Sequence, residues 1–235
     1  MIIQKKILGI LGGMGPQATI DFQQKILNLT NAGADQEHMR IFIDSHPQIP
    51  SRMPAILGNG ESPIRALQES VQKLDSCGVD YIAMPCVTAH YFLPQLAIPA
   101  RIKFLNMPEL AAAACAARYP GQTAGVLSTE GTAKSGVVTD ILKKSGIPFI
   151  NPLDNDQRLL GQLISRVKAK ADMEEIVSQF RLITERMSAQ GAGYFLLACT
   201  EIPLIVQSHN FPFAYVDSTA ELARAAVKAC GFDFC

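Results

Sequence analysis

Short apolar runs alternate with amphipathic stretches along the first half of the chain. The apolar runs predict buried strands and lie at Lys6–Leu11, Arg40–Asp44, Tyr81–Pro85 and Ile102–Asn106. Apolar residues at helical spacing follow these runs, over Gln17–Leu29, Ile64–Ser76 and Ala89–Leu96 and from Glu109 onward. Pro16 is typical of a helix start, and Gly78 is typical of the left-handed residue that ends one. This order predicts an α/β fold with a parallel sheet covered by helices.

The second half of the chain repeats the first. The segment Gly9–Gly15 (GILGGMG) matches Gly125–Gly131 (GVLSTEG), because both read G-[IV]-L-x-x-x-G before a helical stretch. The segment Gly78–Cys86 (GVDYIAMPC) matches Gly191–Cys199 (GAGYFLLAC), because both read G-x-x-Y-x-x-x-x-C after a long amphipathic helix. Matches in the same order at similar spacing predict two similar half-domains.

A third match fixes the boundaries that we expect. Glu-Leu-Ala occurs at Glu109–Ala111 and again at Glu221–Ala223, each time after a short strand. We therefore predict an N-terminal half-domain over residues 1–107 and a C-terminal half-domain over 108–216, with the helix in 217–235 packing back on the first. The prediction is two parallel sheets flanked by helices, related by a pseudo-twofold axis with the active site between them.

Composition and charge restrict the class of protein. Of the 235 residues, 48% are hydrophobic and 18% are charged, which suits a soluble globular protein with a real core. The 21 basic and 21 acidic residues are spread along the chain without a basic stripe, so we expect no nucleic-acid partner.

The lengths of the apolar runs and the cysteine and histidine content indicate the location of the protein and whether it binds a metal. The N-terminal apolar stretch is short and interrupted by glycines, and no run reaches the about 18 apolar residues of a membrane span. We therefore expect a cytoplasmic protein with no membrane contact. Its six cysteines should be reduced thiols, and with no C-x-x-C pair and only four scattered histidines we expect no metal.

The repeat changes the interpretation of two cysteines. Cys86 and Cys199 each follow a predicted strand, and in open α/β sheets the functional crevice lies outside the carboxyl ends of the strands. Each alone is more simply a buried thiol. As a matched pair, they are what two-base proton transfer needs, because one removes a proton from a carbon and the other returns one to the opposite face.

A thiol must lose its proton to act as a base, and a free thiol is mostly protonated at neutral pH. Each cysteine precedes a predicted helix start, VTAH after Cys86 and TEIP after Cys199. We expect the helix N-termini to lower the pKa of both thiols. The same N–H groups, with the hydroxyls of Thr88 and Thr200, are suited to a substrate carboxylate.

Five motifs together resemble the aspartate/glutamate racemase family, whose members racemise amino acids without a cofactor. They are LGGMGPQAT near the start, SRMP at Ser51–Pro54, PCVTAH at Pro85–His90, LSTEGT at Leu127–Thr132 and ACTEIPL at Ala198–Leu204. The resemblance covers nearly the whole chain. It implies two similar α/β domains, often dimeric, that use two cysteines at the α-carbon of an acidic amino acid.

The resemblance also implies roles for single residues. Cys86 and Cys199 are the acid/bases, each serving one enantiomer, with no cofactor. The implied substrate contacts are Met14, Arg52, Val87, Thr88, Thr129, Lys168, Thr200 and Glu201. Arg52 is similar in position to the arginine that binds the side-chain carboxylate, and Lys168, with Lys170 as a rival, completes that pocket.

One position departs from the family pattern. The first cysteine motif usually reads P-C-N-T, and this chain has Val87 in place of the asparagine. Valine has neither the donor nor the acceptor of asparagine, so a contact to the substrate is lost or moved. The chemistry can survive this change, but substrate identity is open among aspartate, glutamate and another acidic metabolite.

Three residues keep a structural alternative. His90 is better explained as packing or capping the helix after Cys86 than as a base. Glu201 either tunes Cys199 or is simply an acid in the first turn of a helix. Arg52, in a proline-rich loop, is by itself compatible with a solvated surface residue.

Rival functions remain from the sequence. Gly13, Gly15 and Ala18 fit G-x-G-x-x-A with Asp44 at the end of the next strand, the pattern of dinucleotide binding. That pattern explains neither cysteine. The other rivals are a hydantoin or related racemase and a protein that binds an acidic metabolite without reaction. The preferred hypothesis is L/D interconversion of aspartate or glutamate by a homodimer.

Overall fold

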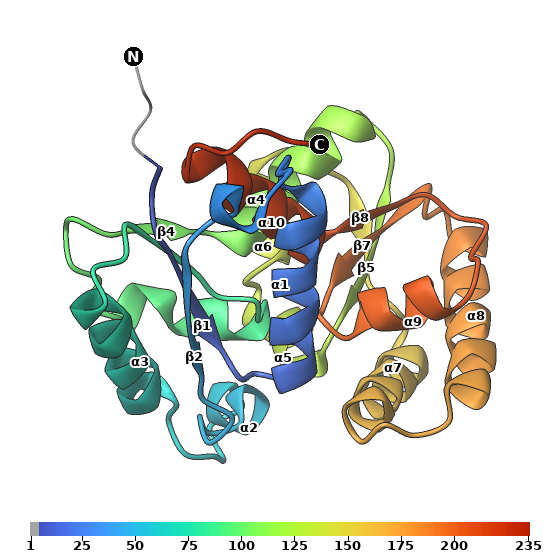
Figure 1. The fold of residues 1–235 in the computed structure, drawn as a ribbon. Coiled ribbons are helices and arrows are strands. Elements are labelled where there is room, and N and C mark those ends of the chain that lie inside the picture. The colour runs from blue at the N-terminus through green and yellow to red at the C-terminus, as the bar shows by residue number, and fades with distance from the viewer. Residues whose placement is uncertain (1–4) are drawn as a thin grey trace. The chain divides into compact units, whose positions relative to one another are not determined.

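The computed structural model describes residues 5–235, and it divides the chain into two compact units (Figure 1). The first unit comprises the chain up to Met107 together with Thr219–Cys235, and the second comprises Pro108–Ser218. Among the described residues, no helix has the length and apolar character that a bilayer crossing requires.

The first unit is built on a parallel sheet of four strands in the order β2-β1-β3-β4. Its elements are β1 (Leu8–Gly12), α1 (Pro16–Leu29), η1 (Asp35–Glu37), β2 (Ile41–Ser45), α2 (Arg52–Ile56), α3 (Ile64–Ser76), β3 (Tyr81–Ala83), η2 (Thr88–Gln95), β4 (Lys103–Leu105) and, from the end of the chain, α10 (Ser218–Ala229). The helix α4 (Met107–Arg118) begins where this unit ends.

The second unit has a parallel sheet of four strands in the corresponding order, β6-β5-β7-β8. Its further elements are β5 (Ala124–Ser128), α5 (Glu130–Ser135), α6 (Thr139–Lys144), β6 (Phe149–Ile150), α7 (Asp154–Lys168), α8 (Met173–Ala189), β7 (Tyr194–Ala198), α9 (Ile202–Ser208) and β8 (Tyr215–Asp217). The predicted fold class is confirmed, because two parallel sheets flanked by helices have the same strand order.

The helix ends follow from the local sequence. The helix α3 has the predicted bounds, and Gly78 follows it with φ of 72°, a left-handed value that glycine adopts without strain. Pro16 occupies the first position of α1, as predicted. The predicted helix over Ala89–Leu96 is instead the 3-10 helix η2, which contains Pro94 and thus lacks one helical N–H donor.

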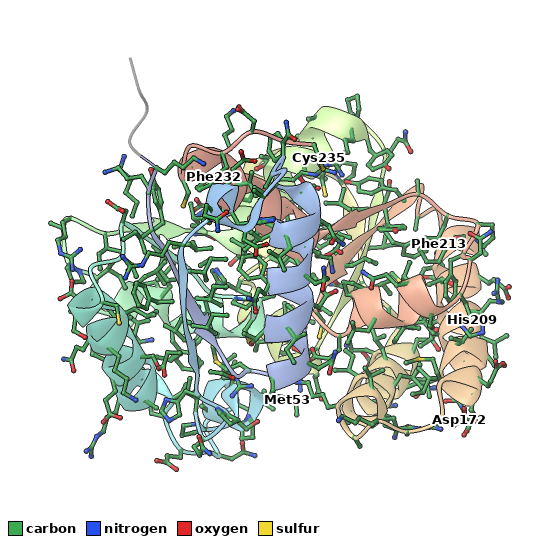
Figure 2. All side chains as sticks on the ribbon, viewed as in Figure 1. Met53, Asp172, His209, Phe213, Phe232 and Cys235 are labelled. Atoms are coloured by element: carbon green, nitrogen blue, oxygen red, sulfur yellow. The ribbon has the colours of Figure 1, made fainter. Side chains whose placement is uncertain are left out.

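The C-terminal segment is tied to the first unit. The Sγ atom of Cys235 donates to the carbonyl of Asn28 at 3.0 Å, and an isolated bridge pairs Thr30 with Phe234. The ammonium of Lys5 lies 4.4 Å from the ring centre of Phe232, which follows α10. Figure 2 labels Phe232 and Cys235 in this C-terminal segment. These contacts explain why the end of the chain belongs with the first sheet.

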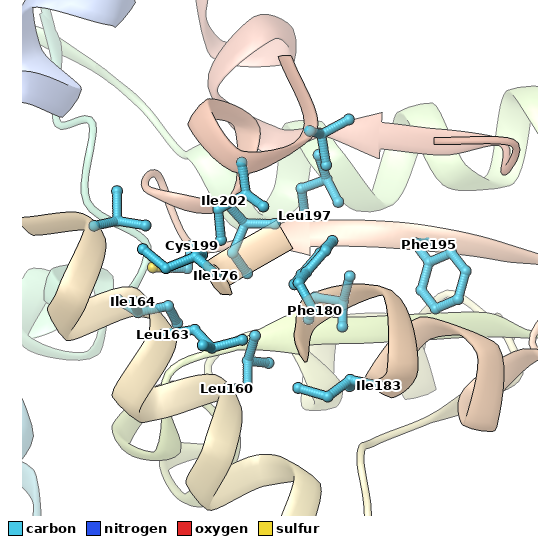
Figure 3. Packing of buried hydrophobic residues seen from close by; sticks show 14 of the residues in the cluster. Leu160, Leu163, Ile164, Ile176, Phe180, Ile183, Phe195, Leu197, Cys199 and Ile202 are labelled. Carbon is cyan, nitrogen blue, oxygen red and sulfur yellow. The ribbon is translucent and has the colours of Figure 1, made fainter. Parts of the chain in front are cut away.

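Each unit has its own apolar core beside its sheet. In the second unit, α7, α8 and α9 pack on one another and on β5 and β7, through residues such as Leu160, Phe180 and Ile205. Cys199 lies at one end of this cluster, beside Ile164 and Ile176 (Figure 3). The core therefore holds the strand whose carboxyl end carries one of the two cysteines.

Candidate active site

Cys86 lies just beyond the carboxyl end of β3, in a buried segment of the first unit. Its thiol belongs to the apolar cluster that contains Leu11 and Phe92, and only 6% of the residue is exposed. The N–H of Cys86 donates to the carbonyl of Met84 at 2.7 Å, and its own carbonyl accepts the N–H of Ala89 at 3.2 Å. A tight turn thus holds this thiol at the end of the sheet.

The glycine loop after β1 contributes Met14 to the same apolar cluster, where it is 3% exposed. Gly13 has φ of 91°, and a Cβ there would lie 2.4 Å from the backbone of His46, so only glycine fits. The N–H of Gly13 donates to Oγ1 of Thr19 at 2.9 Å. Local packing explains this glycine, and its N–H is already used within the loop.

Arg52 is the first residue of α2, a helix that packs against η2 after Cys86. Its Nη1 atom donates to the carbonyls of Ile49 and Pro50, both at 3.0 Å. The guanidinium is therefore oriented by its own loop rather than free in solvent. Within residues 5–235 no partner takes its Nε or Nη2 donors, which leaves them for a carboxylate.

The two residues after Cys86 are buried as well. Val87 is 2% exposed and Thr88 is 9% exposed. Val87 has helical backbone angles and its carbonyl accepts the N–H of His90 at 3.0 Å, so its backbone closes the turn that follows the cysteine. The position that departs from the family pattern is thus part of the buried turn around the thiol.

His90 uses both ring nitrogens for backbone contacts. Its Nε2 accepts the N–H of Met107 at 3.2 Å, so the ring hydrogen is on Nδ1, which donates to the carbonyl of Cys86 at 2.9 Å. Burial lowers the pKa of His90 to about 4. The ring is therefore neutral near pH 7 and has a structural role, which is the interpretation that the sequence favoured. Neither ring nitrogen is left to act as a base.

Cys199 occupies the matching place in the second unit, directly after β7. The strands β5 and β7 pair with Ser128 opposite Ala198, so Thr129 and Cys199 leave the sheet side by side. Cys199 is 5% exposed and packs in the cluster of Figure 3. Each of the two cysteines therefore lies at the carboxyl end of the third strand in its sheet order, one per unit.

A buried carboxylate organises the surroundings of Cys199. Oε2 of Glu201 accepts the thiol hydrogen of Cys199 at 3.1 Å and the hydroxyl of Thr200 at 3.2 Å. Its Oε1 lies 3.5 Å from Nζ of Lys168, whose side chain is 42% exposed against 3% for the glutamate. The second unit thus brings together four of the residues that the sequence predicted.

The orientation of Glu201 decides between its two sequence interpretations. It is the N-cap residue of α9, but its side chain makes no capping hydrogen bond. It accepts from Cys199 instead. The interpretation that Glu201 tunes the cysteine is therefore the one that the contacts favour.

The expected lowering of the thiol pKa is wrong for Cys199. Burial raises its pKa well above the ordinary value, and the charge of Glu201 raises it further, while the ammonium of Lys168 lowers it. The prediction considered only the helix N-terminus, which lowers a thiol pKa. Desolvation and the neighbouring carboxylate raise the pKa of Cys199 by more than that effect lowers it. Cys199 is a protonated thiol in the described state, which suits an acid rather than a base.

The lysines 168 and 170 differ in surroundings. Lys170 is the left-handed residue after α7, with φ of 56°. Its N–H donates to the carbonyl of Val167 and the N–H of Ala171 to that of Arg166, both at 3.0 Å, which is the Schellman pattern of a helix end. Within residues 5–235, it is Lys168 rather than Lys170 that pairs with Glu201.

Thr129 and Gln157 mark the end of β5. Oγ1 of Thr129 accepts the N–H of Thr132 at 3.1 Å, so this predicted substrate contact also caps α5. The sequence analysis missed Gln157, whose Nε2 donates to the carbonyl of Ser128 at 2.9 Å. Its Oε1 is buried without a hydrogen-bond partner among the described residues. No motif marks such a glutamine, because the contact depends on the packing of α7.

A metal ion needs a cluster of ligating side chains, and a dinucleotide needs a glycine loop with N–H groups available to phosphate. Within residues 5–235 no three His, Cys, Asp or Glu side chains gather as a metal ion needs. The dinucleotide pattern loses its main support, because the N–H of Gly13 is occupied by Thr19 and its missing side chain makes room for His46. The two matched thiols, with Lys168 and Glu201 around Cys199, are the chemistry that the site residues offer.

Comparison with known proteins gives matches to racemases along nearly the whole chain. Residues 11–226 match the family profile described as Asp/Glu/Hydantoin racemase. The structure of Picrophilus torridus aspartate racemase has 33% identity and a TM-score of 0.89, covering 98% of this chain and 96% of that one. The broad specificity amino-acid racemase RacX of Bacillus subtilis is 29% identical over 229 residues, which are 94% of this chain and 97% of that protein.

A more distant structure shows the fold alone. Glutamate racemase of Francisella tularensis, solved in complex with D-glutamate, is 14% identical with a TM-score of 0.68, and the match covers 97% of this chain and 81% of that one. The pair of units therefore recurs in proteins whose sequences have largely diverged.

Proposed function

Because the chain belongs to the Asp/Glu/Hydantoin racemase family, we propose that it interconverts the L and D forms of an acidic amino acid through Cys86 and Cys199. The observation that carries the proposal is the matched placement of the thiols. One follows β3 and the other follows β7, at corresponding positions of two sheets with the same strand order. A racemase needs one acid/base for each face of Cα, and two equivalent thiols supply them.

The proposed proton transfer is balanced between the two thiols. In one direction, the thiolate of Cys86 removes the Cα proton, and the thiol of Cys199 gives its proton to the opposite face of the carbanion. One event leaves Cys86 as the thiol and Cys199 as the thiolate, which is the state that serves the reverse direction. A second event in the same direction requires Cys86 to release its proton to solvent and Cys199 to take one up, with no net proton consumed. The contact between Cys199 and Glu201 supports Cys199 as the first proton donor. The proposal requires both thiols to reach the same Cα atom, without pyridoxal phosphate or a metal.

The positive charges of Arg52 and Lys168 support an acidic substrate. Arg52 has donors available beside the segment after Cys86, and Lys168 lies beside Glu201 near Cys199. A substrate with two carboxylates gains from two cations, whereas a basic one is repelled by them. We place aspartate first, since the Picrophilus torridus relative bears that name, with glutamate second.

The substrate assignment is tested with a panel of L-amino acids. Aspartate, glutamate, alanine and lysine are each incubated with enzyme, and the D-enantiomer is measured by chiral chromatography. The proposal predicts the highest kcat/KM for aspartate or glutamate. Faster conversion of lysine or alanine overturns the acidic substrate while leaving the racemase intact. Light scattering on the same preparation tests the homodimer that the resemblance implies.

The second candidate is a protein that binds an acidic metabolite without reaction. Val87, buried in the turn after Cys86, favours it, because it cannot supply the donor and acceptor of the usual asparagine. Calorimetry distinguishes the candidates. Saturable binding of aspartate without any D-aspartate formed supports the binder, and formation of D-aspartate excludes it.

A further inference from the structure

The ring of His90 joins two backbone segments that lie just beyond the paired ends of β3 and β4. One is the carbonyl of Cys86, at 2.9 Å from Nδ1, and the other is the N–H of Met107, at 3.2 Å from Nε2. Met107 is the last residue of the first unit and the first residue of α4. The histidine is 4% exposed, and its ring meets that of Phe104 edge-on, with centres 5.8 Å apart and an angle of 76°.

We infer that His90 is a positioning residue, which fixes the thiol of Cys86 by its hydrogen bond to the carbonyl of that cysteine, while the contact to Met107 orients the ring. The inference rests on the proposed function insofar as Cys86 takes part in proton transfer. It assigns His90 no contact with substrate, because both ring nitrogens are already used by the backbone.

The turn at Cys86 needs such an anchor. The strand β3 ends at Ala83, and the next helix, η2, begins only at Thr88. The helix η2 is of the 3-10 type, whose hydrogen bonds have poorer geometry than those of an α-helix. The bond from His90 therefore adds to the backbone hydrogen bonds of the turn as a restraint on the cysteine. Catalysis by proton transfer depends on placing the thiol to within a fraction of an ångström.

Because the ring of His90 is neutral, its two hydrogen bonds do not change with pH in the neutral range. Burial lowers the pKa of His90 to about 4. Nε2 accepts and Nδ1 donates only in the neutral form, since a protonated ring donates from both nitrogens. Both contacts therefore persist at the pH of an ordinary assay.

Three substitutions separate positioning from simple packing. His90→Asn keeps a donor near the place of Nδ1 and loses the contact to Met107. His90→Gln keeps an acceptor near the place of Nε2 and loses the contact to Cys86. His90→Phe keeps the ring and its packing on Phe104 but loses both hydrogen bonds.

The test measures alkylation of the whole protein by iodoacetamide, with the peptides of Cys86 and Cys199 quantified separately by mass spectrometry. In the Phe and Gln variants, Cys86 is labelled about tenfold faster than in wild type, the factor that corresponds to one lost hydrogen bond. In the Asn variant its rate stays close to wild type. Cys199 serves as the internal reference and does not change. His209→Phe, the same substitution at a histidine of the second unit, leaves Cys86 unaffected.

Three results overturn the inference. They are wild-type labelling of Cys86 in the Phe variant, equal labelling in the Asn and Phe variants, and an equal increase at Cys199. Circular dichroism establishes that each variant is folded. If the Phe variant does not fold, the comparison of Asn with Gln decides, because only the Asn variant keeps the bond to the cysteine.

Steady-state kinetics then connect position to reaction. His90→Phe lowers kcat about tenfold while KM stays within about twofold, since the ring does not touch substrate, and His90→Asn restores most of kcat. A change confined to KM contradicts the inference. If the wild type racemises no amino acid, the proposed function fails, but the alkylation comparison still decides the role of His90.

Discussion

The thiol of Cys199 donates its hydrogen to Oε2 of Glu201, with 3.1 Å between sulfur and oxygen. Both side chains are buried, and Nζ of Lys168 lies 3.5 Å from the other carboxylate oxygen, Oε1. The thiol of this unit is therefore held in its protonated form by burial and by a like charge. In a two-base reaction, a protonated Cys199 is the residue that donates a proton to the substrate carbanion.

Replacing Glu201 by glutamine lowers the pKa of Cys199. The charge of Glu201 raises that pKa, so its removal increases the thiolate fraction, although burial still keeps the pKa above its ordinary value. We expect alkylation of Cys199 at pH 8 to accelerate about threefold to tenfold. Glu174→Gln, at an exposed glutamate of the same unit, is the control and changes nothing. An unchanged rate in the Glu201 variant means that the carboxylate does not tune the thiol.

Lys168→Met has two consequences. It raises the pKa of Cys199 further, because the ammonium lowers that pKa, and it removes a cation proposed for the acidic substrate. We expect kcat/KM for aspartate to fall about 10- to 100-fold. Lys170→Met is the matched control and keeps kcat/KM near wild type. Equal losses in both variants contradict the choice of Lys168, and a loss only in the Lys170 variant reverses it.

Lys170→Gly stabilises the protein. Lys170 has φ of 56° at the end of α7, where a residue with a Cβ is strained and glycine is not. We expect the free energy of unfolding to rise by about 1 kcal/mol, which corresponds to about 2–4 °C in Tm. Calorimetry measures the shift. Lys170→Ala keeps the Cβ and gains nothing, so equal stabilisation by alanine and glycine argues against backbone strain as the cause.

Asp80 makes the stability of the first unit depend on pH. Its Oδ2 accepts the N–H of Ile7 at 2.9 Å, and this bond, with the ammonium of Lys6, holds its pKa below 3.8. A lowered folded pKa contributes stability that is complete above the unfolded pKa and is lost as the pH falls through the folded one.

We therefore expect Asp80→Asn to cost about 1 kcal/mol at pH 7 and less at pH 3. Urea unfolding of wild type and variant at both pH values gives the difference. A difference that stays the same at pH 3 shows that the charge of Asp80 contributes nothing.

Much of the fold could be predicted because the sequence carries it locally. The bounds of α3 agree with the apolar spacing and with Gly78, and the internal repeat predicted two sheets of the same kind. The strand β6 was not predicted, since Phe149 and Ile150 are too short a run to show any periodicity. Short strands depend on their neighbours, here the pairing with β5.

The cluster around Cys199 was predictable in its residues and not in its electrostatics. Cys199, Glu201 and Lys168 were identified from motifs and resemblance, and they lie together in the second unit. The direction of the pKa shift of Cys199 was not predictable, because it depends on burial and on where the carboxylate of Glu201 points. Gln157 escaped detection because its contact joins residues 29 apart in sequence.

The central claim, proton transfer by two thiols, is tested most directly by exchange at Cα in D2O. L-aspartate and L-glutamate are incubated separately with wild type, Cys86→Ser and Cys199→Ser, and deuterium is followed by NMR together with optical rotation. The account predicts that the wild type forms a D-enantiomer carrying deuterium at Cα, and that each serine variant racemises at least about 100-fold more slowly. Racemisation by both serine variants at the wild-type rate contradicts the account.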